Sequence, residues 1–146
     1  MRRYFYHAEG YPFKKGDNIV IADQEHSANL FPWINLHQKR GVELHIVTSR
    51  NGEVLADDLI NAIDENTKAL TISAVQFTTG FYADLYRIGE ICKKHDILFV
   101  VDGIQALGRL KIDVKAMHID WLAAGTNKGL LGTRVRSYVL QSPYQQ

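Results

Sequence analysis

The sequence predicts an α/β domain of three layers, with helices on both faces of a mainly parallel, doubly wound sheet. Ile97–Val101 is a continuous apolar run that ends directly at Asp102, and such a run is typical of a strand buried on both faces. Other strand-like runs alternate along the chain with helical patterns of about three turns, which favours right-handed βαβ units. Because no repeat, low-complexity tract or linker divides residues 1–146, we expect a single domain.

The first half of the chain is predicted to hold three strands and two helices. Turn-forming residues at Lys14–Asn18 lead into a strand at Asn18–Ala22. A helix is expected to begin near Phe31, beside Pro32, and to end at Gly41 in a left-handed cap. Further along, β-branched runs and regularly spaced leucines predict a strand at Val42–Val47, a helix around Leu55–Ile63 and a strand at Ala69–Val75.

The second half continues the same alternation. The helix expected over Asp84–His95 places Leu85, Ile88 and Cys92 on one face, which is the face that would pack on the sheet. The remaining predicted elements follow in chain order: the strand Ile97–Val101, a brief element at Ile112–Met117, and strands at Ile119–Ala124 and Ser137–Gln141.

Composition excludes several classes of protein. The 146 residues include 17 basic and 16 acidic side chains, for a net charge of +1, so there is no electrostatic reason to expect nucleic acid or an anionic membrane as partner. Cys92 is the single cysteine, which rules out an internal disulfide and a multi-cysteine metal site within this sequence. No apolar run approaches the roughly 20 residues of a membrane span, and we predict a cytoplasmic protein without a metal centre.

Side chains that could bind a ligand or take part in catalysis follow four of the predicted strands. His26 follows the first, a run of hydroxyl residues follows the third, Asp102 and Gln105 follow the fourth, and Lys128 follows Ile119–Ala124. Each alone is more often a structural or solvated side chain. Ligands of open α/β sheets bind at the carboxyl ends of the strands, and a carboxylate buried there needs a hydrogen-bonding or cationic partner. The joint placement therefore predicts a site at this edge.

Three ordered motifs carry a resemblance to a known family. Glu25–Trp33 (EHSANLFPW), Val101–Gly108 (VDGIQALG) and Gly125–Gly132 (GTNKGLLG) resemble motifs of the class V aminotransferase superfamily. These are fold-type I pyridoxal phosphate enzymes that include cysteine desulfurases, selenocysteine lyases and isopenicillin N epimerase-like proteins. The resemblance extends from Gly16 to Leu140 and implies the large domain of this fold.

The resemblance implies a role for each strand-end residue toward pyridoxal 5'-phosphate. Lys128 would form the Schiff base, Asp102 would pair with the pyridine nitrogen, His26 would stack on the ring, and Gln105 would bond its phenolic oxygen. These residue types suit the chemistry, since a carboxylate keeps the pyridine protonated and an imidazole can relay protons at neutral pH. The resemblance also implies an amino-acid substrate, transamination, desulfurase, lyase or epimerase chemistry, and a homodimer.

The sequence departs from the family pattern at several positions. Gly125, Thr126 and Asn127 precede the lysine where relatives carry Ser-Gly-His or Gly-Gly-His, so we expect Thr126 and Asn127 to contact the phosphate instead. Phe77 stands where desulfurases carry an asparagine. Cys92 lies on the inner face of a predicted helix and is not expected to act as a desulfurase nucleophile.

Two segments of the family pattern are not found in this sequence. The glycine-rich phosphate loop should precede Lys14, and the small domain would follow Gln146. Residues 1–146 thus correspond to the central part of a large domain, for which we predict weak activity or none in isolation. We also expect self-association, because the terminal segments are rich in aromatic residues: Tyr4, Phe5, Tyr6, Tyr11, Phe13, Tyr138 and Tyr144.

Two other interpretations remain open at this point. One is a non-catalytic remnant or interaction module that keeps the fold. The other is a phospho-receiver domain, in which a strand-end aspartate, a hydroxyl group and a lysine also converge. A receiver needs further acids after the first strand, and Asp23 and Glu25 are the candidates. The positions of His26, Gln105 and Asn127 fit a receiver poorly.

Overall fold

A computed structural model describes residues 10–133 and 137–141, and it confirms the predicted α/β fold. Six strands form one sheet in the order β2-β1-β3-β4-β5-β6, in which the first five are parallel and β6 runs antiparallel to β5. The strands are β1 (Asn18–Ala22), β2 (Glu43–Val47), β3 (Thr67–Ser73), β4 (Leu98–Asp102), β5 (Trp121–Gly125) and β6 (Ser137–Gln141).

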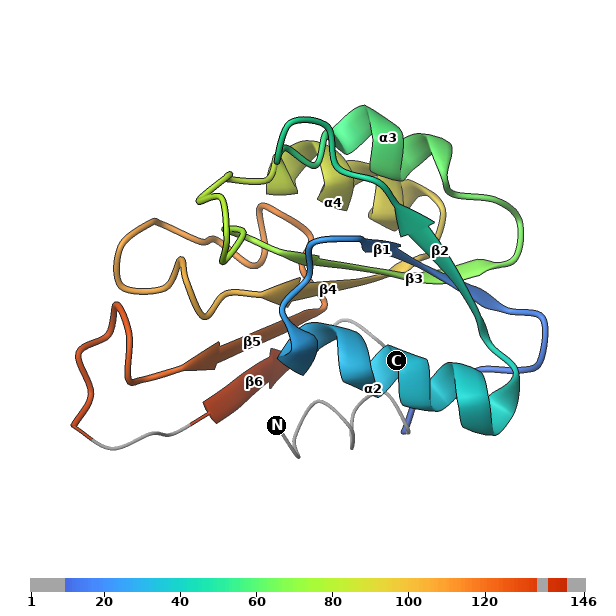
Figure 1. Cartoon of the computed structure of the whole chain (residues 1–146), viewed down its shortest axis with the longest axis horizontal. Coiled ribbons are helices and arrows are strands. Elements are labelled where there is room, and N and C mark those ends of the chain that lie inside the picture. Colours follow the sequence, from blue (N-terminus) through green and yellow to red (C-terminus); the bar gives the residue numbers. More distant parts are fainter. Residues whose placement is uncertain (1–9, 134–136, 142–146) are drawn as a thin grey trace.

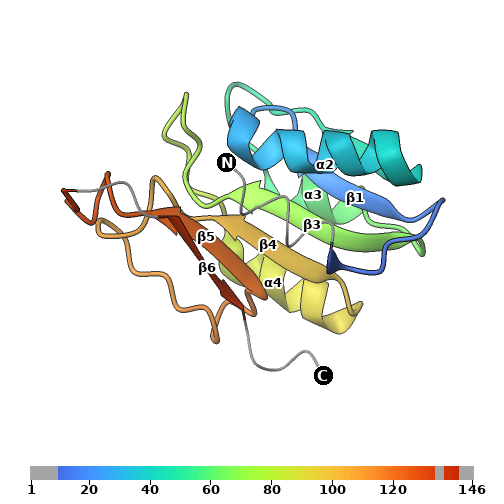
Figure 2. The same ribbon diagram turned by 90° about the horizontal axis from the view of Figure 1, so that it is seen from below.

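Helices cover both faces of the sheet, as a doubly wound fold requires. Helix α2 (Ser27–Arg40) lies on one face, and α3 (Ala56–Asn61) and α4 (Leu85–Lys94) lie together on the other (Figures 1 and 2). Because the chain passes from β1 to β2 on one side and returns to β3 on the other, the direction of winding reverses between β1 and β3. Such a switch point leaves a crevice at the carboxyl ends of these two strands.

The first helix begins earlier than the sequence predicts. Helix α2 starts at Ser27 rather than near Phe31, and Pro32 lies inside it. The reason is the cap, because the His26 Nδ1 accepts a hydrogen bond from the Ala28 amide at 3.1 Å, which satisfies one of the free amides of the first turn. The predicted end is confirmed, since Gly41 has φ 69° and closes the helix in the left-handed region.

A second difference concerns Ile112–Met117. This segment forms neither a helix nor a strand, and its last residues are a turn. Asp113 organises the turn, because its carboxylate accepts the amides of Lys115 and Ala116 at 3.2 and 3.1 Å. Short polar side chains that bond the following backbone in this way favour turns over regular helices.

Two apolar clusters, one on each face, hold the layers together. Residues of β1, β4 and β5 are buried at every position. On the α2 face, Trp33 and Leu36 pack with β1 residues, and on the other face Ile88 of α4 packs with Phe99. Full burial of such side chains stabilises the fold by roughly 1.5–3 kcal/mol each.

Two of the aromatic residues near the amino end, Tyr11 and Phe13, pack against the core. Phe13 is buried and its ring meets that of Trp33 edge-on at 6.3 Å. Tyr11 is half-buried between Phe13 and Trp121, with ring centroids 4.6 and 6.5 Å away. These rings fill the edge of the α2-side core. Tyr4, Phe5, Tyr6 and Tyr144, and the side chain of Tyr138, lie outside the described residues. Among the described helices, none is long and apolar enough to cross a membrane.

Candidate functional site at the carboxyl edge of the sheet

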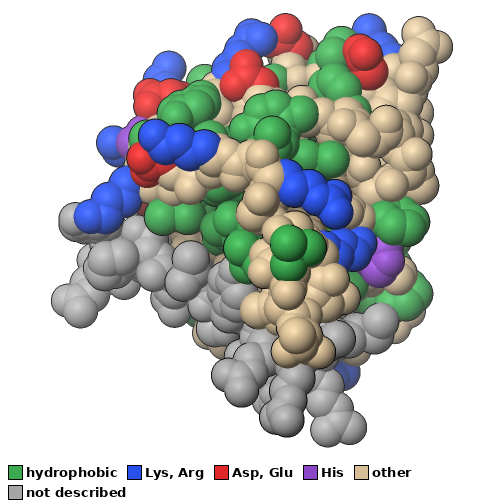
Figure 3. Space-filling view, turned by 90° about the vertical axis from the view of Figure 1, so that its left-hand side faces the viewer, with side chains coloured by type: hydrophobic (Ala, Val, Ile, Leu, Met, Phe, Trp, Pro, Cys, Tyr) green, Lys and Arg blue, Asp and Glu red, His purple; other side chains and the backbone are tan. Residues whose placement is uncertain are grey.

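The strand-end residues singled out in the sequence all lie at one edge of the sheet. His26 follows β1, Phe77 follows β3, Asp102 ends β4 and Lys128 follows β5, and these strands are parallel neighbours. Figure 3 looks onto this edge, where exposed hydrophobic side chains alternate with lysine and arginine. The edge includes the switch point between β1 and β3, the place where open α/β sheets bind their ligands.

The Phe77 ring connects His26 and Lys128. The imidazole of His26 meets the ring edge-on at 5.4 Å between centroids, and the Lys128 ammonium lies 5.1 Å from the centroid of the same ring. A cation at this distance is attracted to an aromatic ring. His26 and Phe77 are both exposed, Phe77 by 57%, and Lys128 is half-buried, so the imidazole and the ring are accessible to a ligand.

Asp102 lies deeper in the same edge. Its side chain is 3% exposed and its Oδ1 accepts the Ile104 amide at 2.8 Å. The register of the sheet places it beside Ser73 of β3 and Ala123 of β5. The residues that follow form a turn, and no helix begins at this strand end. Gln105 is half-buried in that turn.

The loop that carries Lys128 is closed on itself. The Gly132 amide donates to the Thr126 carbonyl at 2.7 Å, and the Leu131 amide donates to the Lys128 carbonyl at 2.9 Å. Thr126 and Asn127 lie in this compact turn directly before Lys128. Thr126 is half-buried and Asn127 is exposed.

Two glycines bring the Lys128 loop against the loop that follows Asp102. A Cβ on Gly108 would lie 2.4 Å from the Gly129 carbonyl carbon, and one on Gly129 would lie 2.3 Å from the Leu107 oxygen. Contact this close is possible only without side chains. The glycine pair thereby fixes the position of Lys128 relative to the end of β4.

A buried polar network lies next to His26 and Phe77. Of its members, the sequence points to Glu25 alone as a candidate site residue. The Glu25 carboxylate accepts hydrogen bonds from the Ser73 amide (2.8 Å), the Ser73 hydroxyl (2.6 Å), the Gln76 amide group (2.9 Å) and the Asn29 amide group (2.7 Å). Thr71 donates to the Asn29 Oδ1 at 3.0 Å. The signal available in the sequence is a pair of hydroxyl residues, Thr71 and Ser73, in the second half of a strand where the other residues are apolar.

This network disfavours the receiver interpretation. Glu25 is buried and engaged by four donors, and Asp23 accepts the Ser49 amide at 3.1 Å. The two acids that a receiver would require are thus already engaged in hydrogen bonds that join loops of the chain. Within the described residues, no group of three or more histidine, cysteine, aspartate or glutamate side chains could hold a metal ion.

A second concavity lies at the opposite, amino edge of the sheet, remote from these residues. Its volume is about 550 Å³, and its lining includes Cys92, Lys93, His118 and Asp120. Burial raises the pKa of the Cys92 thiol to about 12, so the nucleophilic thiolate is scarce at neutral pH. This agrees with the expectation that Cys92 does not act as a nucleophile.

Comparison with known proteins identifies sequences and structures similar to this chain. The family model described as Aminotransferase class-V matches residues 4–134. A probable cysteine desulfurase of Methanothermobacter thermautotrophicus is 35% identical over 126 residues, which is 86% of this chain and 31% of the relative. The cysteine desulfurase IscS of Photobacterium profundum is 34% identical over 115 residues, 79% of this chain and 28% of the relative. The chain therefore spans about a third of the length of the curated relatives it matches.

Solved structures agree with the sequence comparison. The apo structure of the cysteine desulfurase from Thermococcus onnurineus superposes with a TM-score of 0.88 at 30% identity, and covers 97% of this chain and 36% of that one. A complex of the cystine C-S lyase C-DES with cysteine persulfide has a TM-score of 0.88 at 20% identity, covering 96% of this chain and 39% of that one. The second likeness concerns the fold alone.

Proposed function

The chain belongs to the aminotransferase class-V family, and on this premise we propose that it forms the cofactor-binding part of a pyridoxal phosphate enzyme acting on an amino acid. The observation that carries the proposal is the grouping of His26 and Lys128 on the Phe77 ring, at the same sheet edge where the buried Asp102 ends β4. The names of the relatives favour cysteine desulfurase chemistry within the family.

The residues at this edge fit the cofactor by the chemistry of their donor set. Lys128 offers a primary amine for the aldehyde, Asp102 offers a carboxylate for the pyridine nitrogen, and the exposed His26 imidazole offers a flat surface for the ring. Thr126 and Asn127 would serve the phosphate and Gln105 the phenolic oxygen. When bound, pyridoxal phosphate supplies an electron sink for the carbanion that develops on an amino acid.

The protein's own groups would bind and orient the cofactor, and they would move protons near it. Asp102 would hold a proton on the ring nitrogen, because its carboxylate is fixed by the Ile104 amide and cannot swing away without losing this bond. The Lys128 Nζ would attach the cofactor and transfer protons, since a lysine amine serves both purposes when its surroundings favour the neutral form. His26 would offer the face of its imidazole to the cofactor ring and could relay protons at neutral pH.

A thiol for desulfurase chemistry is not available within these residues. Cys92 is the single cysteine, its side chain is fully buried, and its pKa is raised to about 12 by burial. A cysteine desulfurase reaction on this chain therefore needs a thiol from outside residues 1–146. Amino-acid binding, transamination and elimination do not need one.

Trapping with borohydride tests the proposal. The full chain incubated with pyridoxal phosphate is expected to develop a new absorbance band, and borohydride should fix the cofactor covalently on Lys128, as located by peptide mass mapping. Lys128→Ala should abolish this adduct. The double variant Lys93→Ala/Lys94→Ala is the control, because both lysines are exposed at the end of α4 and away from the carboxyl edge.

Equal trapping over all surface lysines would contradict the proposal. That result would support the alternative that the chain is a non-catalytic remnant or an interaction module that has kept the fold.

A further inference from the structure

We propose that Glu25 is a positioning residue whose buried carboxylate sets the relative places of His26 and Phe77. The part of this inference that concerns the cofactor rests on the proposed function, whereas the part that concerns the two rings does not. It starts from the burial of Glu25, which is 7% exposed and receives four hydrogen bonds.

The donors around Glu25 are all neutral, and they complete its hydrogen bonding. Oε1 accepts the Ser73 amide and the Gln76 Nε2, and Oε2 accepts the Ser73 hydroxyl and the Asn29 Nδ2. An ionised carboxylate only accepts hydrogen bonds, so two at each oxygen suit it. Burying a charge costs several kcal/mol in general, and apolar side chains often give equal or greater stability. Stability alone therefore gives a weak reason for a carboxylate at this place.

The carboxylate joins three segments of the chain at one point. Asn29 belongs to the first turn of α2, Ser73 is the last residue of β3, and Gln76 begins the turn that carries Phe77. His26 is the residue directly after Glu25 and caps α2. The position of one ring is thus linked to that of the other through a single side chain.

The Gln76 carboxamide shows how strongly Glu25 determines its neighbours. Its Nε2 donates to Glu25 at 2.9 Å, while its Oε1 is buried without a hydrogen-bond partner, which is unfavourable. Rotating the amide by half a turn would direct the oxygen at the carboxylate and replace attraction with repulsion. Glu25 therefore fixes one orientation of Gln76.

The backbone of Gln76 transmits this orientation to Phe77. Its amide donates to the Phe81 carbonyl, and its carbonyl accepts the Gly80 amide, both at 2.9 Å. These two bonds close the turn in which Phe77 stands. Phe77 in turn meets His26 at 5.4 Å and Lys128 at 5.1 Å, so loss of the Glu25 contacts should release both rings.

Four variants of the full chain test the inference, and a fifth, Phe77→Leu, serves as the reference. Glu25→Ala removes all four hydrogen bonds. Glu25→Gln keeps the shape, because its oxygen can still accept the Ser73 and Gln76 amides. At the other atom the Ser73 hydroxyl can turn and the Asn29 amide can flip to accept its new donor. Asp23→Ala is the matched control, since Asp23 is an exposed acid of the same loop that bonds Ser49. Gln76→Met removes one donor with little change in volume.

The first measurement does not involve the cofactor. Phe77 shifts the imidazole proton resonances of His26 through its ring current, and Phe77→Leu gives their position without that effect. At one alkaline pH, where histidine side chains are neutral, Glu25→Ala should move the His26 resonances most of the way to the Phe77→Leu position. Glu25→Gln and Asp23→Ala should leave them in place, and resonances of His37 should not move in any variant.

The second measurement is the affinity for pyridoxal phosphate, from the absorbance band and the borohydride-trapped fraction on Lys128. Glu25→Ala should weaken it about ten- to a hundredfold, as expected when reactive groups are misplaced by about 1 Å, with Glu25→Gln restoring most of the loss. Failure of the unaltered chain to trap the cofactor would count against the proposed function alone.

Unmoved His26 resonances in a folded Glu25→Ala chain would overturn the positioning role and leave Glu25 as a core residue. If Glu25→Ala does not fold, Gln76→Met decides the question in its place. A shift of the His26 resonances in Gln76→Met supports the link between the two rings, and its absence refutes it.

Discussion

At the scale of single residues, a substitution of Asp102 can separate the effect of its charge on cofactor binding from its effect on the fold. Its Oδ1 accepts the Ile104 amide at 2.8 Å, a bond that an asparagine oxygen can also make. Asp102→Asn should therefore preserve the fold while removing the charge that, in the proposed function, would keep the ring nitrogen protonated. Loss of a charge-assisted hydrogen bond of about 1.5–3 kcal/mol corresponds to roughly ten- to a hundredfold weaker pyridoxal phosphate binding. A thermal unfolding midpoint close to that of the unaltered chain is the control, and undiminished affinity would contradict the assigned role.

The Cys92 thiol permits a prediction at the same scale. It is fully buried, and desolvation, followed by the negative charge of Asp120, raises its pKa to about 12. We expect the folded protein to be inert to a thiol-specific disulfide reagent at pH values near 8, with complete reaction once denaturant unfolds the chain. Rapid labelling of the native protein would show that the helix face carrying Cys92 opens readily.

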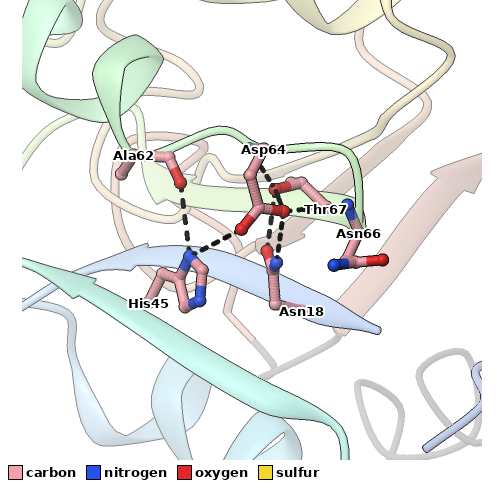
Figure 4. Close-up of polar contacts among 6 residues, drawn as sticks. All are labelled: Asn18, His45, Ala62, Asp64, Asn66 and Thr67. Atoms are coloured by element: carbon pink, nitrogen blue, oxygen red, sulfur yellow. Dashed lines mark hydrogen bonds and ion pairs between the residues drawn. The ribbon is translucent and has the colours of Figure 1, made fainter. Parts of the chain in front are cut away.

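At the scale of secondary-structure elements, a polar cluster joins the starts of β1 and β3 to the end of α3 (Figure 4). The Asp64 Oδ1 accepts the Asn18 Nδ2 at 2.7 Å and the Asn66 amide at 2.8 Å, and Thr67 donates to the Asn18 Oδ1 at 2.7 Å. The hydrogen bond from Asn18 is the main cause that lowers the pKa of Asp64, and the nearby His45 adds to it. The cluster holds the α3–β3 connection against the sheet.

The lowered pKa of Asp64 makes this contribution depend on pH. A carboxyl group whose pKa is lower in the folded state stabilises the protein above its unfolded pKa, and the effect is lost as pH falls through the folded value. Asp64→Ala should reduce the free energy of unfolding at neutral pH by about 1 kcal/mol, a modest value because the side chain is half-exposed. The difference from the unaltered chain, measured by urea unfolding, should shrink below a pH of about 4. A difference independent of pH would contradict this origin.

The contact at Gly108 between the loop after β4 and the loop that carries Lys128 permits a prediction about stability. Gly108 has φ +85° and almost touches Gly129, whereas Gly80 has φ +74° and no neighbour within 4 Å of an added Cβ. Gly80→Ala should cost only the conformational term, about 1–2 kcal/mol. Gly108→Ala should cost about 1–3 kcal/mol more through overpacking, and it should also reduce trapping on Lys128. Equal losses of stability in the two variants would show that the loops can separate freely.

At the scale of the whole molecule, apolar side chains lie exposed along the carboxyl edge. Leu131 is 87% exposed, Phe77 57%, Leu110 43% and Leu130 42%. Several exposed apolar side chains at one edge of a domain are typical of an interface between proteins. We therefore expect self-association in sedimentation velocity experiments, with the weight-average sedimentation coefficient rising with concentration. Leu131→Ser should shift the distribution toward monomer, and a monomer at high concentration for the unaltered chain would count against this expectation.

The sequence alone determined the fold class, the order of elements and the edge at which the candidate residues lie. Continuous apolar runs such as Ile97–Val101 specify buried parallel strands, and alternation with helices of matching length restricts the topology. Since parallel strands end at a common edge, placing His26, Asp102 and Lys128 after such strands was enough to bring them to one side. The motifs around them then pointed to the family that the comparisons show.

Only the tertiary structure decided the contacts within that edge. The start of α2 at Ser27 depends on a cap by His26, and the turn at Gln105 depends on contact with a loop that is distant in sequence. Glu25, Ser73 and Gln76 meet across 48 and 51 positions of the chain. Periodicity reports which face of an element is apolar, but a hydrogen bond between distant polar residues leaves no period in the sequence. For this reason the contacts of the Phe77 ring with His26 and Lys128 appear only in three dimensions.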